Sequence, residues 1–224
     1  MIFNNFKKIK VGYFYKYSSI VPRFLFQELS VSNVGCPATA SNKNRIYGLK
    51  PTITMDIEFG LNDLGNPYYN YEFDNKNFHK TKNVHNAIED MIVVQKQNNK
   101  CVLQVMQYIH LVTDNKKLEV TLLDPAKTNY KNCDFITASF KPYGWIRSIN
   151  ASYIQNSDLP GKVKLNVNED VYRLFFNMPI DLNEIIPNEK IIRYEQTVFN
   201  VAGYLKGLNK IYPRILKLRP KKLL

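Results

Sequence analysis

The chain has 224 residues and a formal net charge of +12, from 31 Lys and Arg against 19 Asp and Glu. Its 45% hydrophobic content argues against an intrinsically disordered body and is enough for a sizeable core. Cys36, Cys101 and Cys133 form no Cys-x-x-Cys pair, which argues against a disulfide framework or a zinc site, and no apolar run approaches the about 18 residues of a transmembrane helix.

Residues 1–29 are predicted to form a basic N-terminal arm. Residues 2–9 contain apolar side chains at helical spacing, whereas residues 12–17 alternate like a strand. The segment lacks the continuous apolar stretch of a secretory signal. Residues 30–51 contain Ser, Asn, Gly and Pro, and they predict a long connection between the arm and the body. The first 23 residues contain no acid and five bases: Lys7, Lys8, Lys10, Lys16 and Arg23.

A β-hairpin is predicted at residues 53–73. Residues 53–59 alternate strictly between apolar and polar side chains, with Asp56 and Glu58 on the polar face. Turn-forming residues follow at 60–67, and a second strand is expected at 68–73.

One internal helix is predicted at residues 84–96, with Asn83 as its N-cap and apolar residues at helical spacing. Residues 101–112 are expected to form a strand that pairs with 118–123 through a tight turn at Asp114-Asn115. Further strands are predicted at 135–140, 145–154, 163–167, 171–176 and 193–202, with a short helix possible at 181–186.

Residues 203–224 are predicted to form a basic C-terminal arm. Leu208, Ile211, Ile215 and Leu218 have helical spacing, but Pro213 and Pro220 argue against a long regular helix. The arm contains no acid and seven bases: Lys206, Lys210, Arg214, Lys217, Arg219, Lys221 and Lys222. Because the two basic segments together account for the whole excess of +12, residues 24–202 are electrically neutral.

The pattern predicts an α+β, β-rich fold, with an antiparallel sheet, sandwich or barrel, one or two short helices and extended basic terminal arms. The strands do not alternate with helices, which disfavours a doubly wound parallel sheet. We expect a single body at residues 30–202, flanked by the arms at 1–29 and 203–224.

No catalytic, cofactor-binding or metal-binding residue is predicted. His79 and His85 miss the i, i+4 spacing of a helical metal pair, and glycine-rich phosphate loops are absent from the sequence. His110 is expected to point away from the core. Cys101 and Cys133 have apolar surroundings that keep a thiol inert. Asp56 and Glu58 share a strand face that could approach a metal, although a solvated outer face explains them better.

The arms are the predicted contact sites. Clustered bases can neutralise several phosphates or dock on an acidic groove of a neighbouring subunit. The sequence therefore favours a non-enzymatic subunit of a large, homo-oligomeric assembly. The natural case is a virus or phage particle protein (shell, connector or tail component), found in the virion or the cytoplasm. The alternatives are a nucleic-acid-binding protein of ribosomal type and a metal-dependent nuclease. The predicted contact residues are Lys7, Lys8, Lys10, Lys206, Lys210, Arg214, Lys217, Arg219, Lys221 and Lys222.

Overall fold

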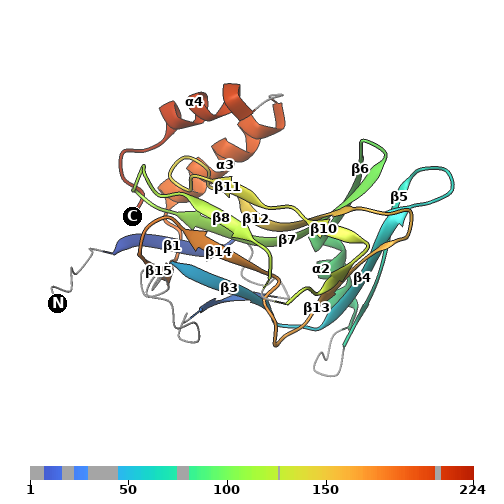
Figure 1. Cartoon of the computed structure of the whole chain (residues 1–224). Helices are drawn as coiled ribbons and strands as arrows, with labels where there is room; N and C mark the ends of the chain where they lie inside the picture. The colour runs from blue at the N-terminus through green and yellow to red at the C-terminus, as the bar shows by residue number, and fades with distance from the viewer. Residues whose placement is uncertain (1–7, 17–22, 30–44, 75–80, 126, 205–207) are drawn as a thin grey trace.

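Fifteen β-strands and three α-helices make up the part of the chain that the computed structural model describes (Figure 1). That part comprises residues 8–16, 23–29, 45–74, 81–125, 127–204 and 208–224, with the backbone alone described at 81–82, 201–204 and 208–212. The strands form three sheets, which we call A, B and C. The predicted β-rich α+β class is confirmed, and the described strands do not close into a barrel.

Sheet A has the strand order β10-β12-β7-β1-β15, and β6 also pairs with β7. Every pairing in this sheet is antiparallel except that of β1 with β15, which is parallel. Its strands are β1 (Ile9–Tyr15), β6 (Ile92–Gln97), β7 (Lys100–Val112), β10 (Cys133–Phe135), β12 (Ser148–Gln155) and β15 (Ile180–Glu184).

Sheets B and C are antiparallel, with the orders β11-β8-β14-β3-β2 and β5-β4-β13-β9. Sheet B contains β2 (Phe24–Glu28), β3 (Ile46–Pro51), β8 (Val120–Leu123), β11 (Ala138–Phe140) and β14 (Tyr172–Phe176). Sheet C contains β4 (Met55–Leu61), β5 (Pro67–Phe73), β9 (Tyr130–Lys131) and β13 (Gly161–Leu165).

The main core lies between sheet A and the other two sheets, in a sandwich-like arrangement. One buried cluster takes side chains from all three sheets. Aromatic rings join the layers: Phe135 of sheet A stacks with Tyr172 of sheet B, and Tyr153 of sheet A contacts Tyr130 of sheet C. Strict alternation explains the inner faces, because Met55, Ile57 and Phe59 are buried whereas Asp56 is exposed.

The N-terminal basic segment contributes strands to the body. β1 lies between β7 and β15 in sheet A, and β2 pairs with β3 in sheet B. The described part of residues 1–29 is therefore integrated in the sheets rather than extended from them. The helix considered within residues 2–9 falls mostly outside the described residues.

Several predicted elements are confirmed. The hairpin at 53–73 forms β4 and β5, and its turn is held by Asn62 Oδ1, which accepts hydrogen bonds from the amides of Leu64 and Asn66. The strands predicted from residue 101 to 112 and from residue 171 to 176 correspond to β7 and β14.

The predicted helix at 84–96 is α2 (Thr81–Met91), which begins earlier and ends sooner. Asn83 therefore lies inside the helix and is not its N-cap. Residues 92–97 form β6, because Asn98 and Asn99 both have positive φ (49° and 59°) and close a tight turn into β7. The β-branched run Ile92-Val93-Val94 suits this strand.

The predicted pairing of 101–112 with 118–123 is wrong. β7 belongs to sheet A and β8 to sheet B, so residues 113–119 carry the chain from one sheet to the other. The short helix considered at 181–186 is also wrong, because residues 180–184 form β15 and pair with β1. The strand predicted at 193–202 is part of helix α3 (Glu189–Tyr204). Together with α4 (Leu208–Leu218), the described part contains three helices rather than one or two.

Candidate interaction surface at the C-terminal helices

A second apolar cluster attaches the C-terminal helices to sheet A. Phe14 of β1, Val112 of β7 and Ile146 line the face of sheet A that the main core leaves free. The cluster also contains Ile191, Tyr194 and Val198 of α3, Ile215 of α4, and Leu223. Figure 1 shows α3 and α4 together on this side of the sheets. The C-terminal arm is thus folded back on the body along its described part, instead of being extended.

Helix α3 begins with a side-chain cap. Asn188 Oδ1 accepts a hydrogen bond of 3.0 Å from the amide of Ile191, the arrangement expected of an N-cap residue. The other amide atom of Asn188 donates to the carbonyl of Leu223 at 3.3 Å. Tyr194 Oη lies 3.2 Å from the carbonyl oxygens of both Gly144 and Ile215. These contacts join α3, α4 and the residues after α4 into one unit.

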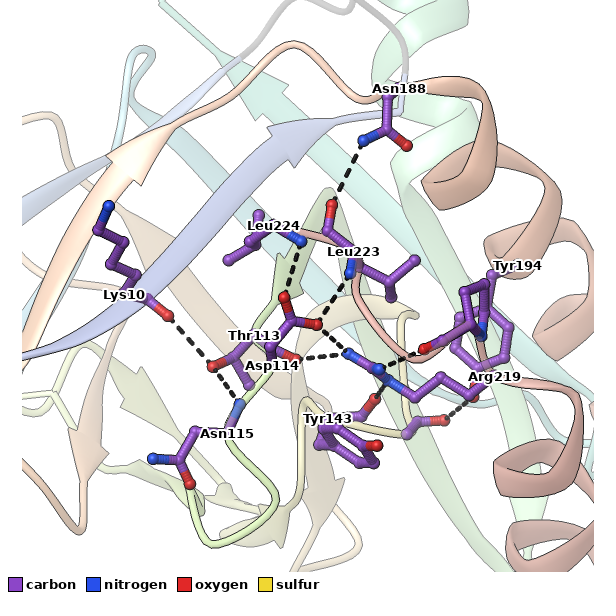
Figure 2. Close-up of polar contacts among 12 residues, drawn as sticks. Lys10, Thr113, Asp114, Asn115, Tyr143, Asn188, Tyr194, Arg219, Leu223 and Leu224 are labelled. Carbon is purple, nitrogen blue, oxygen red and sulfur yellow. Dashed lines mark hydrogen bonds and ion pairs between the residues drawn. The ribbon is translucent and has the colours of Figure 1, made fainter.

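Arg219 anchors the segment after α4 (Figure 2). Its side chain is 1% exposed, and its guanidinium contacts the turn at residues 113–115 as well as Tyr143. Nη2 donates to the Thr113 carbonyl and to Asp114 Oδ1, each at 2.8 Å. Nη1 donates to the Pro220 carbonyl at 2.7 Å, Nε donates to the Tyr143 carbonyl, and the Tyr143 ring centroid lies 3.7 Å from the guanidinium carbon. Arg219 therefore has an internal structural role.

The Asp114 carboxylate completes this anchor. It accepts hydrogen bonds of 2.9 Å from the amides of Leu223 and Leu224 as well as the bond from Arg219. Partial burial by itself raises the pKa of Asp114, but the Arg219 and backbone hydrogen bonds, with the charge of Arg219, hold that pKa below its ordinary value. The ionised carboxylate is therefore the form that the fold selects.

A buried ionic group holds the middle of α3 against the sheet. Glu195 accepts a hydrogen bond from Lys16 Nζ at 2.8 Å, and His110 Nε2 lies 3.5 Å from the same oxygen. Burial raises the pKa of Glu195, but hydrogen bonds from His110 and Lys16 and their charges bring it below its ordinary value. As predicted, His110 points away from the main core. However, it is only 2% exposed, because α3 covers it and Phe14 stacks on its ring.

The exposed bases lie around this anchored unit. Arg214 and Lys217 are exposed on α4, and Lys221 and Lys222 are exposed just after it. Among the residues that the structure describes, none of these four forms an ion pair. By contrast, Lys127, Lys162 and Lys164 of the body each face an acid. We call Arg214, Lys217, Lys221 and Lys222 the basic surface.

The turn at 113–115 also brings the two ends of the sequence together. Thr113 Oγ1 donates to the Lys10 carbonyl at 3.1 Å, while the Thr113 carbonyl accepts from Arg219. Lys116 lies beside this site, with its Nζ 5.7 Å from the centroid of the Tyr143 ring. Lys8 and Lys10 are exposed at the start of β1. Lys7 and Lys206 lie outside the described residues, and Lys210 lies on α4 without a described side chain.

Apolar side chains accompany these charges at the surface. On α3, Ile192 and Phe199 are seven residues apart and therefore share one side of the helix; they are 42% and 57% exposed, and Lys16 Nζ lies 4.9 Å from the centroid of the Phe199 ring. Leu218 of α4 is 58% exposed and Ile186, before α3, is 96% exposed. Leu218 follows Lys217 directly on α4, so at least one exposed apolar group adjoins the unpaired bases, which suits a contact surface better than a purely solvated tail.

The alternative nuclease residues have a different environment. Asp56 pairs with Lys164 at 3.8 Å and Glu58 with Lys162 at 3.1 Å, across the β4–β13 register. Within the described ranges, no group of three potential metal ligands occurs. Burial raises the pKa of Cys133 to about 11 and also raises that of Cys101, which agrees with the prediction of inert thiols.

Sequence reasoning missed the residues that build the anchor. The sequence assigns Asp114 only to a turn, and it assigns Tyr143 and Tyr194 to no contact. The sequence did contain one signal for helix α3: Ile191, Tyr194 and Val198 follow the i, i+3, i+7 spacing of the buried face of a helix. No described helix is both long enough and apolar enough to span a membrane. Comparisons with protein-family models, curated protein sequences and solved structures find no match for this chain.

Proposed function

We propose that this chain is a non-enzymatic structural subunit of a large multi-subunit assembly, and that its basic surface contacts neighbouring subunits or enclosed nucleic acid. A virus or phage particle is the setting we propose, with the chain as a shell, connector or tail component. The other predicted setting is the cytoplasm, where a subunit resides before assembly.

One observation carries the proposal: the basic surface is unpaired and yet held in place. Burying Arg219 and packing α3 and α4 against sheet A fixes the positions of these charges before any partner arrives. A preorganised surface loses less conformational entropy on binding than a flexible tail does. A body of zero net charge suits protein–protein packing better than immersion in nucleic acid, which would repel its acids.

The experiment compares two variants of equal charge. In the first, Arg214, Lys217, Lys221 and Lys222 are replaced by Gln. In the control, four exposed lysines elsewhere are replaced by Gln, namely Lys96, Lys100, Lys117 and Lys141. Mass photometry and sedimentation of the full chain at low salt measure the distribution of oligomers.

We expect the wild type and the control to form the same higher-order species and the first variant to lose them. Unchanged assembly by the first variant would contradict the proposal. The wild type could instead be monomeric and bind nucleic acid. If the slope of log binding constant against log salt concentration then falls in magnitude by about three to four in the first variant, the nucleic-acid-binding alternative of ribosomal type replaces the assembly proposal.

A further inference from the structure

On the outer face of sheet C, the acidic and the basic side chains lie on different strands. Residues 56 and 58 of β4 and 162 and 164 of β13 alternate with buried apolar residues, so they point away from the core. The register places residues 70 and 72 of β5 and 131 of β9 beside them on the same face. The half formed by β5 and β4 is acidic and the half formed by β13 and β9 is basic: Glu72, Asp56 and Glu58 against Lys164, Lys162 and Lys131.

This placement of like charges on neighbouring strands is unfavourable for an isolated chain. Glu72 lies directly opposite Asp56 in the β4–β5 register, and Lys131 lies directly opposite Lys162 in the β9–β13 register. Like charges directly opposite each other on antiparallel strands destabilise a sheet. Ion pairs form only in the middle, between β4 and β13, and the described residues give neither Glu72 nor Lys131 an ionic partner.

The face is open to a partner. A hollow of about 850 Å³ runs over it, lined by these charges together with Asn70, Thr128 and Asn129. The side chains of Lys162 and Lys164 are 61% and 55% exposed, so the ion pairs in the middle are available for rearrangement.

Two copies of this face are complementary in charge when one orientation of a two-fold axis relates them. A two-fold axis parallel to the strands and lying between two facing copies places β5 over β9 and β4 over β13. Asp56 then faces Lys164 and Glu58 faces Lys162 of the other copy, whereas Glu72 and Lys131, which the register places two residues apart along the strands, lie diagonally across the contact. The acidic half of each face thus covers the basic half of the other, and the arrangement is isologous. A two-fold axis across the strands would instead place acids over acids. Facing sheets lie about 10 Å apart, a gap that a lysine and a carboxylate side chain can bridge.

We therefore propose that the outer face of sheet C binds the same face of a second copy of this chain, with the two-fold axis parallel to the strands. The four strands have 7, 7, 5 and 2 residues and lie about 4.8 Å apart, so they cover roughly 330 Å² per copy, well below the about 800 Å² of a standard interface. The dimer is weak and its charges are screened by salt. The contact is independent of the basic surface, and it would supply one of the many weak contacts of an assembly.

The test uses two single charge reversals, Glu72→Lys and Lys131→Glu, with sedimentation velocity of the full chain at low ionic strength. Each reversal removes a like-charge neighbour within its own sheet, so each variant should be at least as stable as the wild type in thermal unfolding. Each should nevertheless dimerise several-fold more weakly, because the diagonal contact between positions 72 and 131 becomes repulsive.

An equimolar mixture of the two variants should dimerise like the wild type, since the base introduced at position 72 of one copy then lies diagonally opposite the acid introduced at position 131 of the other. The reversals Glu89→Lys and Lys96→Glu, at exposed positions off this face, serve as controls and should leave dimerisation unchanged. A wild type that stays monomeric at the highest attainable concentration and low salt would overturn the proposal. So would a mixture that fails to associate. The residues of the basic surface remain intact throughout, so either proposal can fail while the other stands.

Discussion

The guanidinium of Arg219 lies 2.8 Å from the carboxylate of Asp114, although the two residues are 105 positions apart in the sequence. This contact joins the segment after α4 to the crossing between sheets A and B (Figure 2). Because the same carboxylate binds the amides of Leu223 and Leu224, one ion pair determines the path of the last described residues.

Replacing Arg219 by Ala should release this segment. The change leaves three carbonyl acceptors and the partly exposed Asp114 without their donor, and a buried acceptor left unsatisfied costs about 1–3 kcal/mol. We expect a lower free energy of unfolding in urea and faster hydrogen exchange at residues 208–224. Arg219→Lys should rescue only part of the loss, because an ammonium cannot reproduce the planar fork of donors.

Lys222→Ala is the matched control, since Lys222 is exposed and close in sequence; its effect should stay within about 0.5 kcal/mol. Equal hydrogen exchange in Arg219→Ala and the wild type would show that Arg219 does not hold the segment.

Acid should weaken the attachment of the C-terminal helices. The pKa values of Asp114 and Glu195 are lowered in the folded chain, from ordinary values of 3.8 and 4.5. Their contribution to stability is therefore complete above those ordinary values and is lost as the pH falls through the lower folded values. Urea unfolding between about pH 6 and pH 2 should show this loss. The loss of stability on acidification should be smaller in the double variant Asp114→Asn plus Glu195→Gln. The control Asp158→Asn, at an exposed site, should lose as much stability as the wild type.

Asp170 should have the opposite dependence on pH. Burial raises its pKa, and the charges of Lys50 and Arg173 only partly offset that rise. The stability it contributes is present below its unfolded pKa and is lost as the pH rises through the higher folded value. Its Oδ1 is buried without a hydrogen-bond partner among the described residues. Asp170→Asn should therefore stabilise the fold at neutral pH by on the order of 1 kcal/mol. A loss of stability at pH 7 would contradict this.

Gly48 and Asp170 should be energetically coupled. A Cβ at Gly48 would lie 2.2 Å from Asp170 Oδ1 and 2.5 Å from its Cγ, so Gly48→Ala forces the carboxylate to move. We expect a cost of about 1–3 kcal/mol in the wild type. In the Asp170→Ala background the cost should largely disappear. A double-mutant cycle in urea measures the coupling, and additive effects would exclude the steric explanation.

Strict alternation allowed the sheet faces to be predicted from sequence. In residues 55–59 of β4 and in β13 the apolar residues are buried and the charged ones point away from the core, as the period of two requires. Helix α3 was missed because two exposed apolar residues, Ile192 and Phe199, obscure the helical spacing of its buried ones. β6 was merged with α2 because its Ile-Val-Val run continues the apolar pattern, and the turn at Asn98-Asn99 that separates them depends on backbone conformation.

The candidate surface was predictable in charge but not in structure. The absence of acids from residues 203–224 indicated a contact segment, and Arg214, Lys217, Lys221 and Lys222 are indeed exposed. The burial of Arg219 could not be predicted, because its acceptors come from residues 113, 114 and 143. Only the folded chain brings those positions to the segment after α4.

Negative-stain electron microscopy of the purified full chain at low salt tests the central proposal most directly. We predict discrete rings, shells or other closed particles for the wild type, and their loss when Arg214, Lys217, Lys221 and Lys222 are replaced by Gln. A wild-type chain that remains strictly monomeric at high concentration and low salt, with or without nucleic acid, would contradict it.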